Sequence, residues 1–159
     1  MEPIEPGQNV LFLCWGNICR SPFAHRYAAR AWPDVTVGGG GTYPQEGRRT
    51  PREGQAAARA GWGIDLGDHG SHIVTAAEMA VADHVFVFDA KNVGDLGALF
   101  PDDAHKLRLL GPFDPADPDP TITDPYGGGV ETFHHCYTRT ARAIDALRPA
   151  QGAASGEAG

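Results

Sequence analysis

A run of nine residues near the N-terminus, Cys14-Trp15-Gly16-Asn17-Ile18-Cys19-Arg20-Ser21-Pro22, combines residue types that suit phosphate chemistry. Cys14 offers a thiolate nucleophile, and the planar guanidinium of Arg20 can hold two phosphoryl oxygens at once. Ser21 can donate its hydroxyl to the ionised sulfur of Cys14 and stabilise it. Successive backbone N–H groups in a tight loop also form a concave site for an anion. The spacing therefore predicts phosphoryl transfer to Cys14, with Arg20 holding the transferring group.

The residues on either side place this loop between a strand and a helix. The apolar run 9–14 predicts a buried strand, and Ser21-Pro22 predicts an N-cap followed by proline in the first helical turn. A helix N-terminus carries about half a positive charge, which favours a bound phosphate and the thiolate form of Cys14. Gly16 and Asn17 tolerate the left-handed backbone angles that a tight loop can require.

Strands and helices alternate along the rest of the chain. Further strands are expected at 35–37, 85–88 and 106–110, and helices at 52–60, 75–82, 91–100 and 130–147, with Thr75 and Glu78 forming a capping box and Gly38-Gly39-Gly40-Gly41 a loop. This alternation predicts a single-domain α/β fold: a doubly wound, four-stranded parallel sheet of flavodoxin-like order 2-1-3-4 with helices on both faces. Ligands bind beyond the carboxyl ends of such strands, where the loop after Cys14 begins.

Bulk properties limit the partners and the compartment. The chain of 159 residues has a formal net charge of -7, which argues against nucleic acid and anionic membranes as partners. No apolar run is long enough to span a bilayer, residues 1–6 lack a secretory signal, and an odd number of cysteines fits a reducing compartment. We expect a cytoplasmic protein, monomeric or weakly dimeric, with one domain over 1–148 and a disordered tail over 149–159.

The loop resembles the hallmark Cys-x-Gly-Asn-x-Cys-Arg-Ser-Pro of the low-molecular-weight protein tyrosine phosphatase family. Further blocks resemble that family over about residues 9–147: Gly39-Gly40-Gly41-Thr42, Gly63-Ile64-Asp65-Leu66 with His69, Phe88-Asp89 and Asp124-Pro125-Tyr126. The resemblance implies hydrolysis of phosphotyrosine in proteins, and of aryl phosphates, through a cysteinyl-phosphate intermediate. It implies no cofactor and no metal. Cys14 and Cys19 would in any case supply too few ligands for zinc.

The general acid must come from a crowded segment. Asp114, Asp117, Asp119 and Asp124 each precede a proline, so spacing alone does not choose among them. The resemblance assigns the role to Asp124, because only this residue stands in the Asp-Pro-Tyr sequence. Asp124 would protonate the leaving oxygen and then, as a carboxylate, activate water.

Other residues are expected to bind the substrate or support the loop. The phosphate-binding and substrate-binding set is expected to contain Trp15, Gly16, Asn17, Ile18, Cys19, Ser21 and Tyr126. Trp15 stands where related proteins carry a smaller residue, and with Tyr126 and Tyr43 it could form an aromatic rim or serve only in packing. By resemblance, His69 supports the loop through Asn17, although a purely structural role fits it equally well. His72 replaces a more usual arginine.

Cys19 and Cys136 are the other two cysteines of the chain. The resemblance implies that Cys19 can form a disulfide with oxidised Cys14; alternatively, Cys19 is only a small buried residue. Cys136 is expected in the core.

Two other functions are considered. A thioredoxin-coupled arsenate reductase would need relay cysteines, which the segment 74–110 lacks. A catalytically weak phosphotyrosine-binding module stays open.

Overall fold

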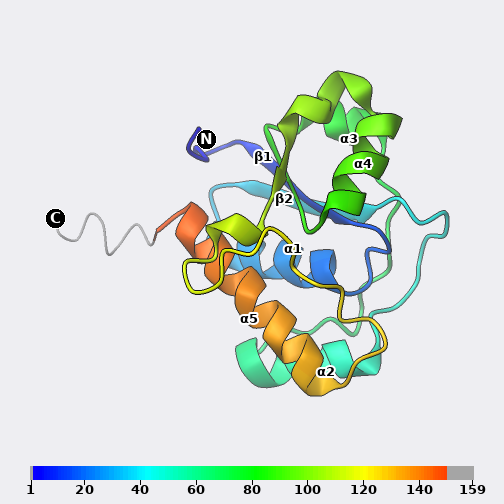
Figure 1. Ribbon diagram of the computed structural model, residues 1–159, viewed down its shortest axis with the longest axis vertical. Helices are drawn as coiled ribbons and strands as arrows, with labels where there is room; N and C mark the ends of the chain where they lie inside the picture. Colours follow the sequence, from blue (N-terminus) through cyan, green and yellow to red (C-terminus); the bar gives the residue numbers. More distant parts are fainter. Residues whose placement is uncertain (1, 150–159) are drawn as a thin grey trace, which may run out of the picture.

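The computed structural model describes residues 2–149, so the tail expected over 149–159 lies outside the described residues except for residue 149. A four-stranded parallel sheet with strand order β2-β1-β3-β4 forms its centre (Figure 1). The strands are β1 (Asn9–Cys14), β2 (Thr36–Gly41), β3 (His84–Val87) and β4 (Leu107–Leu109). The predicted fold class and strand order are confirmed.

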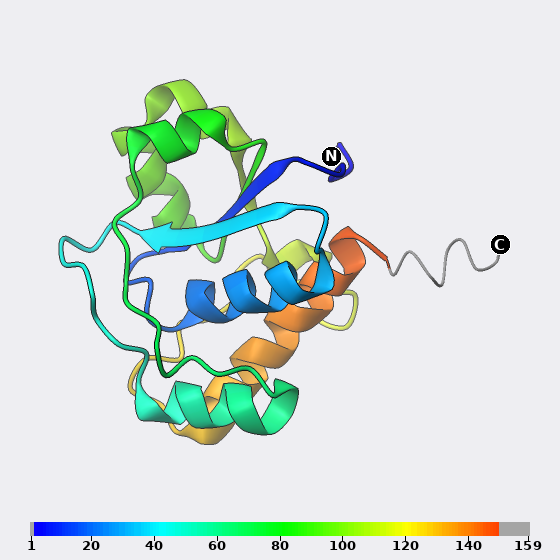
Figure 2. The ribbon, with the colours of Figure 1, turned by 180° about the vertical axis from the view of Figure 1, so that it is seen from behind.

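Helices cover both faces of this sheet. On one face lie α1 (Arg20–Ala31) and α5 (Val130–Leu147), with α2 (Arg52–Trp62) packed against α5; on the other lie α3 (Ala76–Val81) and α4 (Ala90–Leu99) (Figures 1 and 2). Two short 3-10 turns, η1 (Pro101–Lys106) and η2 (Gly111–Phe113), flank β4. Within residues 2–149, none of the helices is both long and apolar enough to cross a lipid bilayer.

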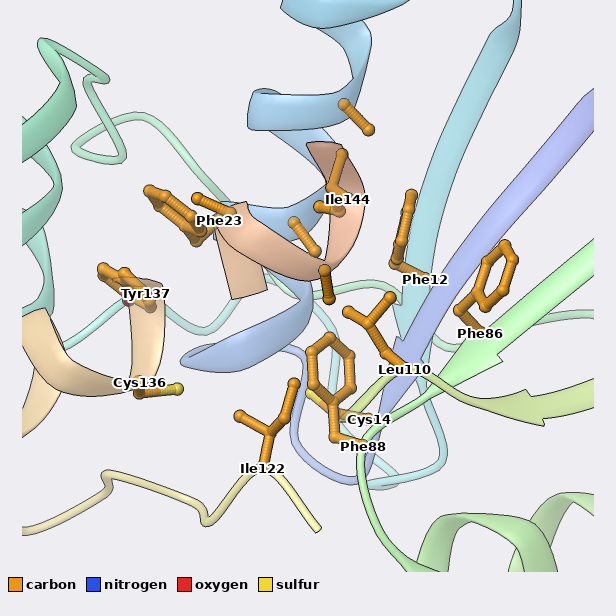
Figure 3. Packing of buried hydrophobic residues seen from close by; sticks show 14 of the residues in the cluster. Phe12, Cys14, Phe23, Phe86, Phe88, Leu110, Ile122, Cys136, Tyr137 and Ile144 are labelled. Atoms are coloured by element: carbon orange, nitrogen blue, oxygen red, sulfur yellow. The ribbon is translucent and has the colours of Figure 1, made fainter. Parts of the chain in front are cut away.

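The sheet separates the apolar core into two halves, and successive side chains of β1 point alternately into one half and the other. Phe12 and Cys14 point into the half under α1 and α5, whereas Leu11 and Leu13 point into the half under α3 and α4. This period of two, with apolar residues on both faces, is the pattern of a central parallel strand. Figure 3 shows the larger half, where Phe12 lies near Phe86 and Ile144. Each large side chain buried in this way contributes about 1.5–3 kcal/mol to stability.

The glycine run belongs to β2, so its interpretation as a loop was wrong. β2 continues through Gly41, which pairs with Cys14 of β1. A Cβ on Gly38 would come within 3.0 Å of Leu11 Cδ2, and one on Gly41 would come within 2.6 Å of the Trp15 carbonyl oxygen. The glycines are therefore explained by the close approach of neighbouring groups to the strand, and not by a need for unusual backbone angles.

Helix α1 begins earlier than its sequence signal predicts. The first helical residue is Arg20, and Cys19 occupies the N-cap without a side-chain capping bond. Ser21 is consequently not the N-cap, and its hydroxyl is directed to Cys14 instead. The capping box of Thr75 and Glu78 at α3 is confirmed, and the remaining α-helices and strands agree with prediction to within two residues, the usual scatter at element ends. The 3-10 segments η1 and η2 were not predicted.

Candidate active site

The loop 15–19 connects the end of β1 to the start of α1, at the carboxyl edge of the sheet. Asn17 adopts the left-handed conformation, with φ of 52°, as its residue type allows. Gly16 does not have a positive φ, so the loop does not use the left-handed conformation that glycine tolerates at this position. Its missing side chain instead leaves room for Arg48, because a Cβ on Gly16 would lie 3.0 Å from Arg48 Nη2.

Cys14 is the cysteine best placed to react. Its Sγ lies 3.0 Å from the Ser21 hydroxyl and accepts the Asn17 backbone N–H at 3.3 Å, and donors of this kind stabilise a thiolate. Burial raises the pKa of the Cys19 thiol and raises the pKa of Cys136 to about 12, so both remain protonated at neutral pH. All three cysteines are free thiols. Within residues 2–149, no group of three or more His, Cys, Asp or Glu side chains is arranged to hold a metal ion.

The polar side chains behind the loop form a connected network. Asn17 donates through Nδ2 to Ser21 Oγ at 2.7 Å and accepts the His72 backbone N–H at 2.8 Å. His69 Nε2 lies 2.7 Å from the Asn17 carbonyl oxygen, which is the contact expected between these two residues. Because burial lowers the pKa of His69, its ring is neutral at pH 7, and a neutral ring that carries its hydrogen on Nε2 donates to that carbonyl.

Arg20 is buried, and of its guanidinium nitrogens only Nη1 makes hydrogen bonds to the described residues. Its Nη1 donates to Asp89 Oδ2 at 2.8 Å and to the Ile122 carbonyl oxygen at 2.8 Å. Its Nε has no hydrogen-bond partner among the described residues. Burial opposes the charge of Arg20, but the neighbouring Cys14 and the bond to Asp89 raise its pKa, so the guanidinium remains protonated. The partners Asp89 and Ile122 were not predicted, although Asp89 lies in the Phe88-Asp89 block just beyond β3.

Asp124 lines the same cavity as Cys14 and Arg20. Its Oδ1 accepts the Tyr126 backbone N–H at 3.1 Å, and its Oδ2 is 3.9 Å from Arg20 Nη2. The side chain is about half exposed, with a relative accessibility of 43%. Among the four proline-preceding aspartates, only Asp124 lines the cavity that contains Cys14. The choice of Asp124 for the acid position is therefore consistent with its location.

Asp114 has a different place, in a buried ion-pair cluster with two arginines of α5. Arg142 Nε donates to it at 2.8 Å and Arg139 Nε at 3.3 Å. Burial opposes the charge of Asp114, but the bonds from Arg142 and Arg139 hold its pKa below the usual range. Arg139 also donates to carbonyl oxygens along the segment before Asp124, at 2.6 Å for Thr121 and 2.9 Å for Asp119. This cluster anchors the segment that carries Asp124, and sequence patterns did not indicate it.

The loop, Arg20 and Asp124 surround one cavity of about 230 Å³. It is lined by Cys14, Trp15, Gly16, Ile18, Cys19, Arg20, Tyr43, Arg48, Asp124 and Tyr126. Trp15 and Tyr43 meet edge to face, with ring centroids 4.9 Å apart, and form one wall. Tyr126 also lines the cavity and is largely exposed. Of the other predicted site residues, Asn17, Ser21 and His69 do not line this cavity, whereas Arg48 lines it without having been predicted.

Comparisons with known proteins agree with this arrangement. A family model described as "Low molecular weight phosphotyrosine protein phosphatase" matches residues 9–153. A low molecular weight protein-tyrosine-phosphatase of Streptomyces coelicolor is 34% identical over 140 residues, covering 80% of this chain and 83% of that protein.

Two solved structures are also similar. Vibrio vulnificus Wzb in complex with benzylphosphonate is 26% identical with a TM-score of 0.78, covering 87% of this chain and 95% of that one. The YwlE arginine phosphatase of Geobacillus stearothermophilus is 25% identical with a TM-score of 0.80, covering 96% of this chain and 97% of that one. From the extent of the family match and the identity to the Streptomyces protein, the chain belongs to the low molecular weight phosphotyrosine protein phosphatase family.

Proposed function

We propose that this chain hydrolyses phosphotyrosine in proteins, and aryl phosphates, through a cysteinyl-phosphate intermediate on Cys14. The observation that carries the proposal is the state of Arg20: Nη1 is anchored by Asp89 and Ile122, whereas Nε has no partner among the described residues. Leaving a buried charged donor unpaired is costly, which favours an anion as its partner in the working enzyme. Residues 1–148 then act as one phosphatase domain.

In the first step, the phosphoryl group lies in the loop against the backbone N–H groups and Arg20. The Cys14 thiolate attacks phosphorus, the bond from phosphorus to the tyrosine oxygen breaks, and Asp124 gives its proton to that oxygen. The buried donors stabilise the charge on the phosphoryl oxygens in the transition state. The reaction requires an ionised thiol and a protonated carboxyl together, so activity should have a bell-shaped pH dependence with a mildly acidic optimum.

In the second step, the Asp124 carboxylate takes a proton from water, and the resulting hydroxide attacks the phosphorus of the cysteinyl phosphate. The sulfur–phosphorus bond breaks and Cys14 leaves as a thiolate. The Ser21 hydroxyl, 3.0 Å from Sγ, stabilises that leaving thiolate. Inorganic phosphate then departs from the loop.

The aromatic walls support an aryl phosphate as substrate. Trp15, Tyr43 and Tyr126 all line the cavity, and aromatic rings pack favourably on one another. The Streptomyces relative is named a protein-tyrosine-phosphatase, whereas one structural neighbour is named an arginine phosphatase. We infer that phosphotyrosine is preferred here, because a flat ring gains more from this rim than an aliphatic arm does. Its protein partners would be phosphotyrosine proteins of the cytoplasm.

Turnover of p-nitrophenyl phosphate, with inhibition by vanadate, tests this proposal. Cys14→Ser should abolish turnover while phosphate still binds. Cys136→Ala is the control: it alters a buried thiol outside the cavity lining and should retain turnover. Full activity of the Cys14→Ser variant would contradict the proposed nucleophile. Binding of a phosphotyrosine peptide without any turnover would indicate a binding module instead. Arsenate-dependent oxidation of thioredoxin would indicate a reductase.

A further inference from the structure

Arg48 lines the cavity, and its positive charge has no role in the proposed reaction. The chain has a net charge of -7, yet Arg48 forms no ion pair with any described residue. The other cations around the cavity are compensated. Arg20 is paired with Asp89, and Lys91, whose Nζ lies 5.3 Å from the centre of the Trp15 ring, is paired with Asp95 at 2.6 Å.

The position of Arg48 is fixed before any ligand binds. Nη2 donates to the Gly16 carbonyl oxygen at 3.0 Å, and the guanidinium carbon lies 3.9 Å from the centre of the Tyr43 ring. Its backbone is held from both sides by Ser71, whose hydroxyl accepts the Arg48 N–H and whose N–H donates to the Arg48 carbonyl, each at 2.9 Å. A side chain that is already ordered loses less conformational entropy on binding an anion.

Most of the hydrogen-bonding capacity of this guanidinium is unused. An arginine has five N–H donors, and the side chain of Arg48 makes one hydrogen bond to the described residues, through Nη2 to Gly16. Its Nε is buried without a partner among them, so the donors left for a ligand are those of Nη1 and the second hydrogen of Nη2. A planar guanidinium in this state is suited to a carboxylate, which it can bind through two parallel hydrogen bonds.

The phosphoryl group itself already has its partners deeper in the cavity, at Arg20 and the loop N–H groups. Arg48 is only partly buried and lies on the wall with Trp15 and Tyr43, so it is available to a second acidic group of the same substrate. We propose that Arg48 is a specificity-determining residue that binds a Glu or Asp side chain adjacent to the phosphotyrosine. This inference rests on the proposed function and narrows its substrate class to acidic phosphotyrosine segments.

Two matched phosphotyrosine peptides test this directly. They have one sequence and differ only in carrying Glu or Gln on either side of the phosphotyrosine, and kcat/KM is measured for both. Wild-type enzyme should prefer the Glu peptide by roughly threefold to fivefold, the range of a partly exposed ion pair. Raising the salt concentration should reduce this ratio, because exposed ion pairs are screened.

Variants then assign the preference to one residue. Arg48→Gln should bring the ratio of the two kcat/KM values close to one, and Arg48→Lys should keep part of the preference. Because each ratio compares two peptides on one variant, any loss of activity that disturbing Gly16 causes on both peptides cancels. Arg49→Gln is the matched control: its Nη1 donates to the Gly67 carbonyl oxygen at 2.7 Å, and it does not line the cavity. This variant should keep the wild-type ratio.

Each outcome is decisive. Equal kcat/KM on both peptides in wild type, or an undiminished preference in Arg48→Gln, would overturn the role of Arg48 and leave the proposed phosphatase activity intact. If Arg48→Gln fails to fold, a wild-type preference that is insensitive to salt overturns the inference, and one that weakens with salt supports it. Wild-type enzyme that hydrolyses neither peptide nor p-nitrophenyl phosphate would refute the proposed function and this inference together.

Discussion

Gly41, at the end of β2, is the position where a single methyl group should damage the site most selectively. A Cβ there would lie 2.6 Å from the Trp15 carbonyl oxygen, 2.8 Å from the Cys14 carbonyl oxygen and 3.1 Å from the Asn17 backbone nitrogen. All three are backbone atoms of the phosphate-binding loop or of the strand residue before it. They cannot rotate away as the end of a side chain can, so Gly41→Ala must move the loop itself.

The size of the effect follows from these distances. The loop backbone has to shift by several tenths of an ångström to reach ordinary contact with the new methyl group. Overpacking of this kind costs about 1–3 kcal/mol of stability. Misplacement of reacting groups by about 1 Å can reduce a rate 100-fold, so we expect kcat on p-nitrophenyl phosphate to fall by roughly 10-fold to 100-fold.

Gly38→Ala is the matched control, since it makes the same change in the same strand. Its Cβ would meet the Leu11 Cδ2 methyl at 3.0 Å, the mobile end of a side chain far from the loop. Urea unfolding and steady-state kinetics on both variants separate stability from catalysis. A Gly41→Ala enzyme with wild-type kcat, or equal losses of kcat in the two variants, would refute the close approach of β2 to the loop.

Three further predictions concern stability and oxidation. Asp114→Asn should lower the free energy of unfolding in urea by about 3–5 kcal/mol, because Arg139 would lose a buried ionic partner; a loss below 1 kcal/mol would contradict that. Burial holds the pKa of His69 below its usual 6.5, so the unfolded chain binds more protons, and the free energy of unfolding should fall as pH decreases below about 6.5. His25 and His84, whose pKa values burial also lowers, contribute to this dependence in the same direction. His69→Gln should therefore make it less steep, and an unchanged slope would exclude His69 as a contributor. Peroxide should oxidise Cys14 to a sulfenic acid, which the Cys19 thiol converts to a disulfide with loss of water. In Cys19→Ala, excess peroxide should instead oxidise the sulfenic acid further to a sulfinic acid, which dithiothreitol does not reduce. Dithiothreitol should therefore restore activity in wild type but not in Cys19→Ala, and equal recovery would remove this switch.

The sequence was sufficient to predict elements whose signals are local. The apolar run of β1 is bounded as predicted, and Thr75 and Glu78 form their capping box, because neighbouring residues determine both features. A run of glycines, by contrast, does not show locally whether it forms a loop or a strand. Residues 38–41 look like a loop in isolation, and only their neighbours in the fold explain why side chains are absent there: Leu11 at Gly38, His25 at Gly39, Val74 at Gly40 and the phosphate-binding loop at Gly41.

The contacts that sequence reasoning missed join residues far apart in the chain. Arg20 is held by Asp89 and by Ile122, which lie 69 and 102 residues away, and Arg48 reaches Gly16 across 32 residues. No spacing rule connects such positions. The loop 14–22 was recognisable because its functional groups are consecutive, whereas the groups that hold it come from Asp89 between β3 and α4, from the Ile122 carbonyl before α5 and from Arg48 after β2.

Trapping the covalent intermediate tests most directly whether Cys14 carries the phosphoryl group. The enzyme is mixed with excess p-nitrophenyl phosphate at mildly acidic pH, quenched in acid during turnover, and digested for peptide mass mapping. We predict one added phosphoryl group on the peptide containing Cys14, located on that sulfur and absent from Cys14→Ser. Steady turnover with no phosphocysteine, or with the phosphoryl group on Cys19 or Cys136, would contradict the mechanism.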